Sequence, residues 1–378
     1  MLIRIKNIIK ITVFYLLVTS IIPSYAQDIS SKEQKLKFNA DVRFRIELDR
    51  ESHKSDGSLR TNRDRTRVRL RLGFIYKYDN VFSFGGRIRT GAKNSAQSPH
   101  VTLGDQLTPK ELNLDKAFIK TNLGSTSFWV GKNSFPFEKQ NEFFWDSDVN
   151  PEGIAFTHSF KYEKLNLKFT AGHFFLDLPT SSSFKDQSSL SALQLSGNSK
   201  INKTNLEAWA GLFSFKDNPN QIDSRLQDLN YNIGVFGGKI SFNNSAHKIS
   251  FGVDLINNFK NYSITLFNNN QKKGYVINFK VSNLNKENNW LFAYYYAYIE
   301  KYAVVPFYSQ DDWIRWGSST ETRSSNFKGH ELRFVYALSK KNNFVLRIYI
   351  VDGINKETSS SITKEDGNRI RFDWNIGF

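Results

Sequence analysis

The sequence of 378 residues contains no cysteine, which excludes a disulfide framework. It also lacks an apolar run long enough for a membrane-spanning helix, which takes about 20 residues. The apolar stretch at residues 11–22 is too short, and no later stretch is longer and equally apolar. A stable chain of this length without disulfides needs a large core or a closed, hydrogen-bonded barrel. Any insertion into a membrane must therefore be by strands.

Histidine is scarce, and no histidine lies in a recognisable serine, histidine and acid signature. The six are His53, His100, His158, His173, His247 and His330. Two of them, His158 and His173, fall on expected strands, where a place in an aromatic girdle or in a lumen is the ordinary explanation. We therefore expect no enzyme, no cofactor and no metal centre, in preference to a barrel lipase or protease.

Residues 1–26 have the pattern of a secretory signal peptide. Arg4, Lys6 and Lys10 form a basic start, and the apolar stretch follows. Small residues at Ser24 and Ala26 then favour cleavage before residue 27. The remaining residues 27–378 are expected to form a single exported β-barrel domain in the cell outer membrane. About ten of them precede the first expected strand, too few for the plug domain of an energised transporter.

Acidic residues are a minority, at 36 against 52 basic ones, and the formal net charge is +16. Loss of the signal peptide removes three cations and no acid, which leaves +13. The mean hydropathy of −0.47 suits a barrel around water, because only alternate residues of each strand face lipid. The 33 Phe, 16 Tyr and 7 Trp suit aromatic girdles, although a soluble sandwich core or a glycan-binding surface would use them too.

Strict alternation of apolar and polar residues fills the end of the chain. The apolar residues at every second position are Ile370, Phe372, Trp374, Ile376 and Phe378. A period of two places them on one face of a strand and excludes an amphipathic helix. The strand resembles the C-terminal strand that the barrel-assembly machinery of outer membranes reads, so Phe378 is the predicted assembly signal. The closing strand of a soluble sandwich would alternate equally well.

The same alternation predicts about sixteen strands, with fourteen or eighteen as alternatives. Each is about long enough for the 9–11 residues of a tilted membrane strand. The predicted fold class is all-β, a transmembrane antiparallel up-and-down β-barrel. The expected strands are 36–48, 65–78, 82–89, 112–121, 126–134, 153–162, 164–177, 190–198, 204–215, 229–243, 247–257, 272–282, 289–302, 327–338, 342–352 and 368–378.

Long and short connections alternate between these strands. The long, polar ones are 49–63, 91–111, 135–152, 178–189, 216–228, 258–271, 303–326 and 353–367. Outer-membrane barrels separate external loops from periplasmic turns in this way, and an even strand count places both termini in the periplasm. A soluble sandwich has no reason to keep this alternation, so it favours the membrane barrel.

Ten arginines fall on the polar faces of the first three strands and the last strand. They are Arg43, Arg45, Arg65, Arg67, Arg69, Arg71, Arg87, Arg89, Arg369 and Arg371. Only Asp41, Glu47 and Asp373 oppose them on those faces. Closure of the barrel would make the four strands neighbours, so we expect an arginine wall that lines the pore. Arginine at the membrane midplane costs about 2–4 kcal/mol, which disfavours a lipid-facing orientation, and a solvated charged face is the remaining alternative.

The connection at residues 135–152 is rich in both acids and aromatic residues. Its acids are Glu138, Glu142, Asp146, Asp148 and Glu152, and its aromatic residues are Phe135, Phe137, Phe143, Phe144 and Trp145. An aromatic loop needs something to pack against, so we expect it inside the barrel as a constriction. Asp146, Asp148, Asn150 and Glu152 alternate as calcium ligands sometimes do, but they lack the glycine and spacing of an EF-hand.

Several short strings follow one another between residues 60 and 160. They are Arg69-x-Arg71, Asp79-Asn80, Arg89-Thr-Gly91, Leu114-Asp-Lys-Ala-Phe118, Gly131-Lys-Asn and Trp145-Asp-Ser-Asp-Val-Asn-Pro-Glu-Gly153. Together they resemble the "putative porin" family of Gram-negative outer membranes. The resemblance implies a diffusion channel, and similarity to general porins implies that the third long loop folds inward. Sixteen-stranded porins are often trimers, so a homotrimer is a candidate assembly.

The leading hypothesis is a passive outer-membrane porin for small hydrophilic or charged solutes, with the acidic loop facing the arginine wall across a waist. Its expected partners are membrane lipid, the assembly machinery and the solutes, and nucleic acid is not among them. The alternative is a non-conducting barrel that acts as an adhesin or surface-binding protein through its external loops. Ion conductance would separate the two.

Overall fold

The computed structural model describes residues 35–177, 187–217, 230–244, 247–262, 271–283, 288–315, 324–356 and 360–378. The chain divides into two compact units, residues 1–37 and 38–378, and the second holds the sheet. The predicted signal peptide lies outside the described residues. Among those that are described, no helix has the length and apolar character needed to cross a membrane.

The described residues form seventeen strands in one sheet, sixteen of them long and one, β4, of two residues. The prediction of about sixteen strands is confirmed. The strands are β1 (Leu36–Arg50), β2 (Arg63–Lys77), β3 (Phe82–Thr90), β4 (Val101–Thr102), β5 (Leu112–Leu123), β6 (Thr126–Lys132), β7 (Glu152–Lys161), β8 (Leu165–Asp177), β9 (Ser188–Ile201), β10 (Thr204–Lys216), β11 (Tyr231–Asn243), β12 (Lys248–Asn258), β13 (Lys273–Ser282), β14 (Asn289–Ile299), β15 (Phe327–Ser339), β16 (Asn342–Gly353) and β17 (Asp366–Gly377).

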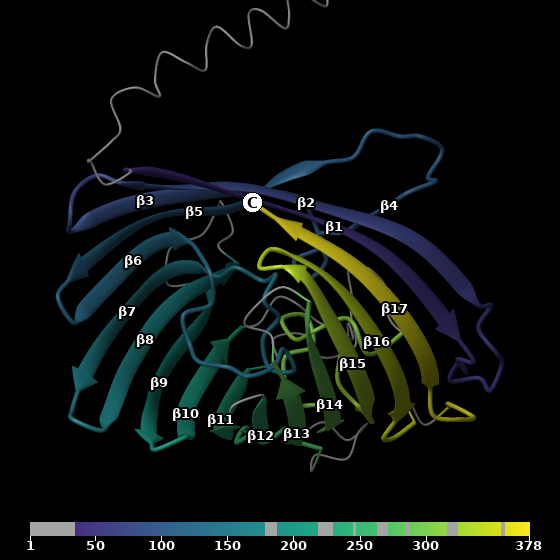
Figure 1. The fold of residues 1–378 in the computed structure, drawn as a ribbon. Coiled ribbons are helices and arrows are strands. Elements are labelled where there is room, and N and C mark those ends of the chain that lie inside the picture. Colours follow the sequence, from purple (N-terminus) through teal and green to yellow (C-terminus); the bar gives the residue numbers. More distant parts are fainter. Residues whose placement is uncertain are drawn as a thin grey trace, which may run out of the picture. The chain divides into compact units, whose positions relative to one another are not determined.

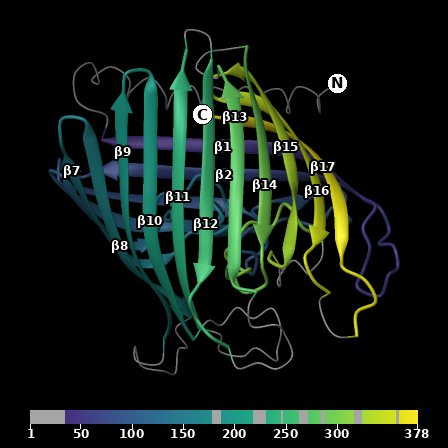
Figure 2. The same cartoon turned by 90° about the horizontal axis from the view of Figure 1, so that it is seen from below.

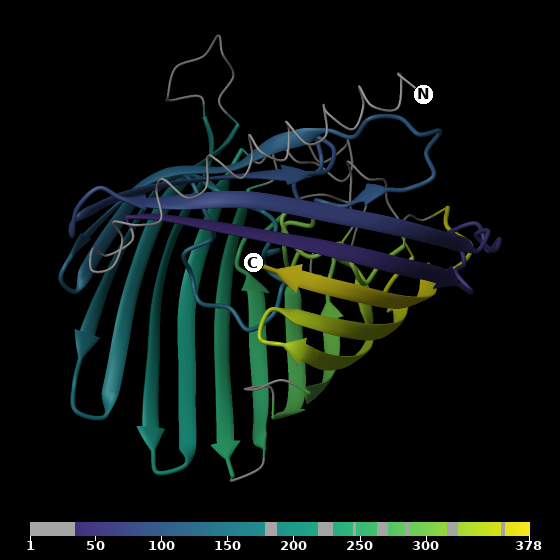
Figure 3. The ribbon, with the colours of Figure 1, turned by 45° about the horizontal axis from the view of Figure 1, so that its top comes forward.

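The sheet closes into an up-and-down antiparallel barrel. Each long strand pairs with its neighbours in sequence, and β1 pairs with both β17 and β2 (Figures 1 and 3). In the register of closure, Phe44 faces Trp374 and Arg45 faces Asp373. Closure leaves no free sheet edge, which is the condition for a sheet to cross a membrane. The predicted fold class is confirmed.

Alternation along each strand separates two environments. On β12, Phe251, Val253 and Leu255 are about half exposed, at 49, 40 and 53%, whereas Asp254 between them is 4% exposed. Large exposed apolar side chains on one face of every wall strand form the belt that faces lipid. Figure 2 shows β8–β14 side by side as one continuous wall. The period of two in the sequence therefore reports the two faces of this wall.

The interior near the long connections differs from the simple water-lined tube that the sequence suggested. Inward side chains there are apolar and buried on β8 to β16, among them Phe174, Leu190, Phe213, Ile233, Phe327 and Tyr349. They form one hydrophobic core with residues of the connecting segments. Segments coloured blue-teal and green lie in the space ringed by the strands (Figure 1). Part of the lumen is thus a packed core against which loops can fold.

Candidate functional site

The arginines of β1, β2, β3 and β17 lie on inward faces of four neighbouring strands. Most of them are held by carboxylates of the same wall. Arg45 Nε donates to Asp373 Oδ1 at 2.6 Å, and Arg369 Nε donates to Asp49 Oδ1 at 2.7 Å. Arg65 pairs with Glu47, Arg69 and Arg71 both pair with Asp41, and Arg87 and Arg89 both pair with Asp115. The wall is therefore an ion-pair network and not a bare positive surface.

Two acids of this network, Asp49 and Asp115, are not among the three acids that the sequence predicts on the polar faces with the arginines. Asp49 follows the expected end of the first strand, which continues in the structure to Arg50. Asp115 turns inward because the register of β3 with β5 shifts between Arg87 and Ile88. Asp115 is 2% exposed. The expectation that only three acids oppose the arginines was wrong, because a bulge and a strand extension change which residues face the lumen.

Three arginines of the wall have other partners. Arg43 Nε donates to Asn375 Oδ1 at 2.5 Å. Arg67 Nη2 donates to Ser98 Oγ at 3.0 Å and to the His100 carbonyl at 3.1 Å. Arg371 pairs with Asp373 on its own strand and with Asp312. The β3–β5 connection thus covers part of the wall from within.

Two paired glycines flank the loop at residues 133–151, and each lies close to the backbone of a neighbouring strand. Gly131 on β6 and Gly153 on β7 face each other in the register, with φ of 117° and 154°. A Cβ on Gly131 would lie 2.2 Å from the Ala117 carbonyl oxygen, and one on Gly153 would lie 2.2 Å from that of His173. Only glycine fits such positions, so these two residues fix the direction in which the loop leaves the wall.

From this point the 133–151 loop crosses the lumen. Asn141 donates to Asp254 on β12, and Phe143 lies 6.1 Å from Phe327 on β15, centroid to centroid. The chain then returns to β2, where Asp148 Oδ1 accepts from Arg71 Nη1 at 3.0 Å. The loop therefore touches the wall on three sides of the barrel.

Aromatic packing holds the loop in place. Phe144 lies 4.5 Å from Phe213 on β10, and the Trp145 ring stacks between Phe135 and Tyr308 at 4.5 and 5.1 Å. Trp145 is 1% exposed, and its Nε1 donates to the Val149 carbonyl at 2.9 Å. Burial of these rings offsets the entropy of ordering a long loop.

The five acids expected in the constriction have different surroundings. Glu138 pairs with Lys168 on β8, Glu142 accepts from the Ser147 amide at 3.3 Å, and Asp146 is buried at 6% exposure. Asp148 is the one of the five that contacts the arginine wall. Glu152 is the first residue of β7, on the same face as exposed Ile154 and Phe156, and it pairs with Lys132 at 2.5 Å. Its placement in the constriction is corrected, because strand alternation turns it outward.

A second inward segment, residues 300–315, was expected only as a polar connection. Its Asp312 pairs with Arg371, with Arg45 at 3.7 Å and with Arg347 at 3.6 Å. The Asp146 amide donates to the Tyr308 carbonyl at 2.7 Å, and the Gln310 amide donates to the Glu142 carbonyl at 2.9 Å. The signal in the sequence was the mixture of Asp311 and Asp312 with Phe307, Tyr308 and Trp313, which repeats the composition of the 133–151 loop.

Burial and neighbouring charges shift the pKa values of acids in the two loops. Burial, together with Glu142 and Asp148, raises the pKa of Asp146 well above its usual range. Burial and the adjacent Asp312 raise the pKa of Asp311 to about 6. Burial opposes ionisation of Asp312 too, but Arg371, Arg45 and Arg347 outweigh it and hold its pKa well below the usual range. The loops therefore contain both permanently charged and titratable carboxyls.

The alternating acids do not converge on a cation site. Asn150 Nδ2 donates to Asp115 Oδ1 at 2.7 Å, Asp148 pairs with arginine and Glu152 points outward. Within the described part of the chain, no three His, Cys, Asp or Glu side chains gather closely enough to hold a metal ion.

Two spaces remain between the loops and the wall: one of about 590 Å³ between the 133–151 loop and strands β3, β5 and β8, and a smaller, more polar one. A cavity of about 290 Å³ lies between residues 139–147, residues 310–313 and strands β13 to β16. Its charged lining comprises Lys139, Lys280, Arg333 and Arg347 against Glu142, Asp312 and Glu331. Arg333 and Arg347 were missed by sequence reasoning, because each is the single arginine of its strand.

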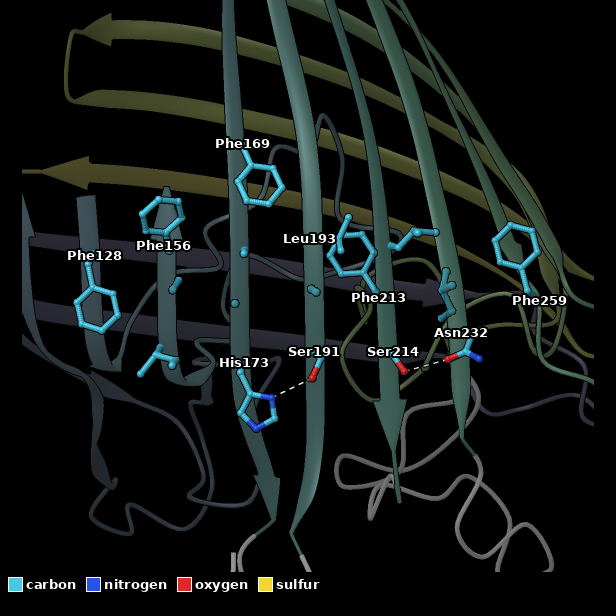
Figure 4. Close-up of a pocket in the computed structure, with 17 residues that line it drawn as sticks. Phe128, Phe156, Phe169, His173, Ser191, Leu193, Phe213, Ser214, Asn232 and Phe259 are labelled. Atoms are coloured by element: carbon cyan, nitrogen blue, oxygen red, sulfur yellow. Dashed lines mark hydrogen bonds between the residues drawn. The ribbon is translucent and has the colours of Figure 1, made fainter. Parts of the chain in front are cut away.

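An apolar hollow lies on the opposite, outer face of the wall, across β6 to β11 (Figure 4). Exposed Phe128, Phe156 and Leu193 line it, and its polar groups pair with each other. His173 is 2.9 Å from Ser191 Oγ, and Ser214 Oγ is 2.9 Å from Asn232 Oδ1. The hollow belongs to the lipid-facing belt and is separated by the wall from the polar cavity.

The C-terminal residue continues the closing strand. The Phe378 amide donates to the Ala40 carbonyl at 2.9 Å, and its side chain is 68% exposed. It lies at the end of the barrel that carries the short turns, because Gly377 pairs with Asp41 near the start of β1.

Comparison with solved structures finds the same fold at low identity. Pseudomonas putida OprB is 11% identical, with a TM-score of 0.58 over 91% of this chain and 94% of that one. OmpF of Salmonella typhi, in complex with daunomycin, is 12% identical, with a TM-score of 0.53 over 91% and 97%. The trimer form of OmpT, an outer membrane protein of Vibrio cholerae, is 9% identical, with a TM-score of 0.51 over 91% and 99%.

A comparison with curated proteins gave no match. Residues 58–232 match the family model described as "Putative porin". This segment contains the glycine pair, the 133–151 loop and the arginines of β2 and β3. Residues 58–232 thus resemble the "Putative porin" family, and the closed sixteen-strand barrel has the fold of outer-membrane porins.

Proposed function

We propose that this protein is a passive diffusion channel for small hydrophilic or charged solutes. One observation carries the proposal: the 133–151 loop crosses the lumen to β12 and β15 and reaches Arg71 on β2. A loop that spans the lumen in this way narrows the barrel at a defined level, where the lining charge decides which solutes pass. Residues 300–315 lie against it and share in the narrowing.

The charges at this level favour anions weakly. Asp148, Asp312 and the wall acids are paired with arginines, so their fields are largely cancelled by near neighbours. Lys280, whose ammonium lies 5.3 Å from the Tyr295 ring centroid in the cavity, adds positive charge to that balance. The waist is therefore proposed as a mixed network with a small cationic excess, in place of two opposed walls of opposite sign.

Planar-bilayer conductance of the purified barrel tests the proposal. We expect stepwise channels in KCl and a larger single-channel conductance when residues 138–148 are deleted. Because the deletion also removes buried aromatic side chains, heat-modifiable mobility must first show that the variant is folded. A folded wild-type barrel that gives no conductance would support the adhesin hypothesis. A folded deletion variant with unchanged conductance would place the narrowing elsewhere.

A further inference from the structure

Two of the three acids that line the polar cavity between the loops and β13 to β16 are already held by donors, and the third, Glu142, accepts from the Ser147 amide at 3.3 Å. Glu331 is 2% exposed, and it accepts from Arg333 Nε at 2.7 Å and from Trp313 Nε1 at 3.2 Å. Asp312 is held by arginines from β1, β16 and β17. Neither carboxylate is therefore available to a cationic solute.

The lysine side chains that line this cavity still have hydrogen-bond donors without a protein acceptor in the described part of the chain. Lys139 Nζ donates to the Trp145 carbonyl at 2.8 Å and to Ser147 Oγ at 2.7 Å, which leaves one of its three protons. Lys280 Nζ lies 5.3 Å from the Tyr295 ring centroid, and no carboxylate of the described residues lies within ion-pair distance of it. The two ammonium groups come from different sides of the cavity, one from the loop and one from β13.

Two further donors lining the cavity are buried without a partner. Gln310 is 4% exposed, and its Oε1 accepts from the Asp312 and Trp313 amides at 2.7 and 2.9 Å. Its Nε2 has no hydrogen-bond partner, and neither has Arg347 Nε, which lies 3.8 Å from Glu331 Oε1. Buried donors of this kind normally find an acceptor, because leaving them unpaired costs free energy. The cavity thus offers donors to a ligand that brings acceptors.

We propose that this cavity is a binding subsite for small organic carboxylates on their way through the channel. The inference rests on the proposed channel function and adds the solute class. A carboxylate is an acceptor-only group, which matches Lys280, Lys139 and the Gln310 amide. Phe143, Trp313 and Tyr295 in the same lining give a carbon skeleton an apolar surface that an inorganic anion cannot use.

Binding and conductance are to be measured on the same folded protein. Equilibrium dialysis of radiolabelled succinate against the detergent-solubilised barrel should show saturable binding. Succinate should also reduce KCl conductance in a saturable manner, and phosphate should do so less. Lys280→Gln should weaken succinate binding about five- to tenfold, since it removes a charge-assisted hydrogen bond, while Lys280→Arg retains most of it.

The matched control is Lys239→Gln. Lys239 is an inward lysine on β11 that pairs with Glu207 at 2.6 Å, outside the cavity lining. It should leave succinate binding unchanged. If both glutamine variants have the same effect, or if succinate does not bind saturably to a conducting barrel, the subsite is overturned while the channel stands. Saturable, Lys280-dependent binding to a barrel that does not conduct would support the subsite and overturn the channel.

Discussion

Asp148, in a loop between β6 and β7, lies 3.0 Å from Arg71 on β2, Oδ1 to Nη1. The side chains are 18 and 19% exposed, so the ion pair is only partly screened by solvent. The same carboxylate lies 3.9 Å from Arg69. This contact ties the returning end of the loop to the arginine wall and cancels part of the wall's charge.

Asp148→Asn should increase anion selectivity. A unit charge about 7 Å from a permeating ion is worth roughly 0.6 kcal/mol at the dielectric of water, which is about a threefold bias. Reversal potentials across a KCl gradient measure the shift. Asp105→Asn is the matched control, because it removes a 65% exposed acid that pairs with Lys110 away from the cavities, and it should leave selectivity unchanged. Equal shifts in the two variants would mean that the effect is one of net charge and not of position.

Arg45→Gln should destabilise the barrel at its closure. Arg45 and Asp373 are 3 and 1% exposed, and removal of one partner of a buried pair costs about 3–5 kcal/mol. Urea unfolding followed by heat-modifiable mobility measures the loss. The control is Arg50→Gln on the same strand, whose partner Asp64 is 66% exposed, and it should have little effect. If Arg50→Gln lowers the stability to urea as much as Arg45→Gln does, the loss does not come from the buried pair at the closure.

Anion selectivity should increase as the pH falls from 7 to 5. Burial and Asp312 raise the pKa of Asp311 to about 6, so its negative charge is lost across this interval. The sign for stability follows from the same shift. Between about pH 4 and 6 the folded chain binds the proton more tightly than the unfolded chain, so stability falls as the pH rises through this window.

Asp311→Asn should reduce the pH dependence of both quantities. The residual dependence would come from Asp146, whose pKa is also raised. Reversal potentials and urea midpoints at pH 5 and pH 7 check this expectation. An unaltered pH response in the folded variant would assign the titration to other groups.

Single cysteines should show which residues of β2 face the lumen and which face lipid. The native sequence has none, so an introduced thiol is unique. A cysteine at Arg71 should react with a small charged thiol reagent and change conductance, whereas cysteines at Leu70 and Leu72 should be shielded by lipid. The reverse pattern would show that the strand is out of phase by one residue.

Phe378→Asp should reduce the amount of folded barrel in the outer membrane and leave unfolded chain in the periplasm. The side chain is 68% exposed, so the substitution removes little packing, and a loss would reflect failed assembly. Fractionation with heat-modifiable mobility measures it. Normal membrane levels would show that the assembly machinery does not depend on this residue.

The sequence determined the wall of this barrel. A period of two is a local property of each strand, so the outward residues Phe44, Phe251 and Trp374 could be recognised without knowing their neighbours. Connection lengths are also local, and they gave the strand count and the two ends of the barrel. The inward placement of Arg45 and Arg71 followed from the alternation of apolar and polar residues along their strands.

Only the tertiary structure decided how the charges meet. Asp312 reaches Arg371 and Asp148 reaches Arg71 through contacts between segments far apart in the chain, which no local period encodes. A register shift turned Asp115 inward, and the start of β7 turned Glu152 outward. The apolar core around Phe213 then gave the loops a surface to fold on. Strand phase depends on neighbours two residues away, whereas loop position depends on packing throughout the lumen.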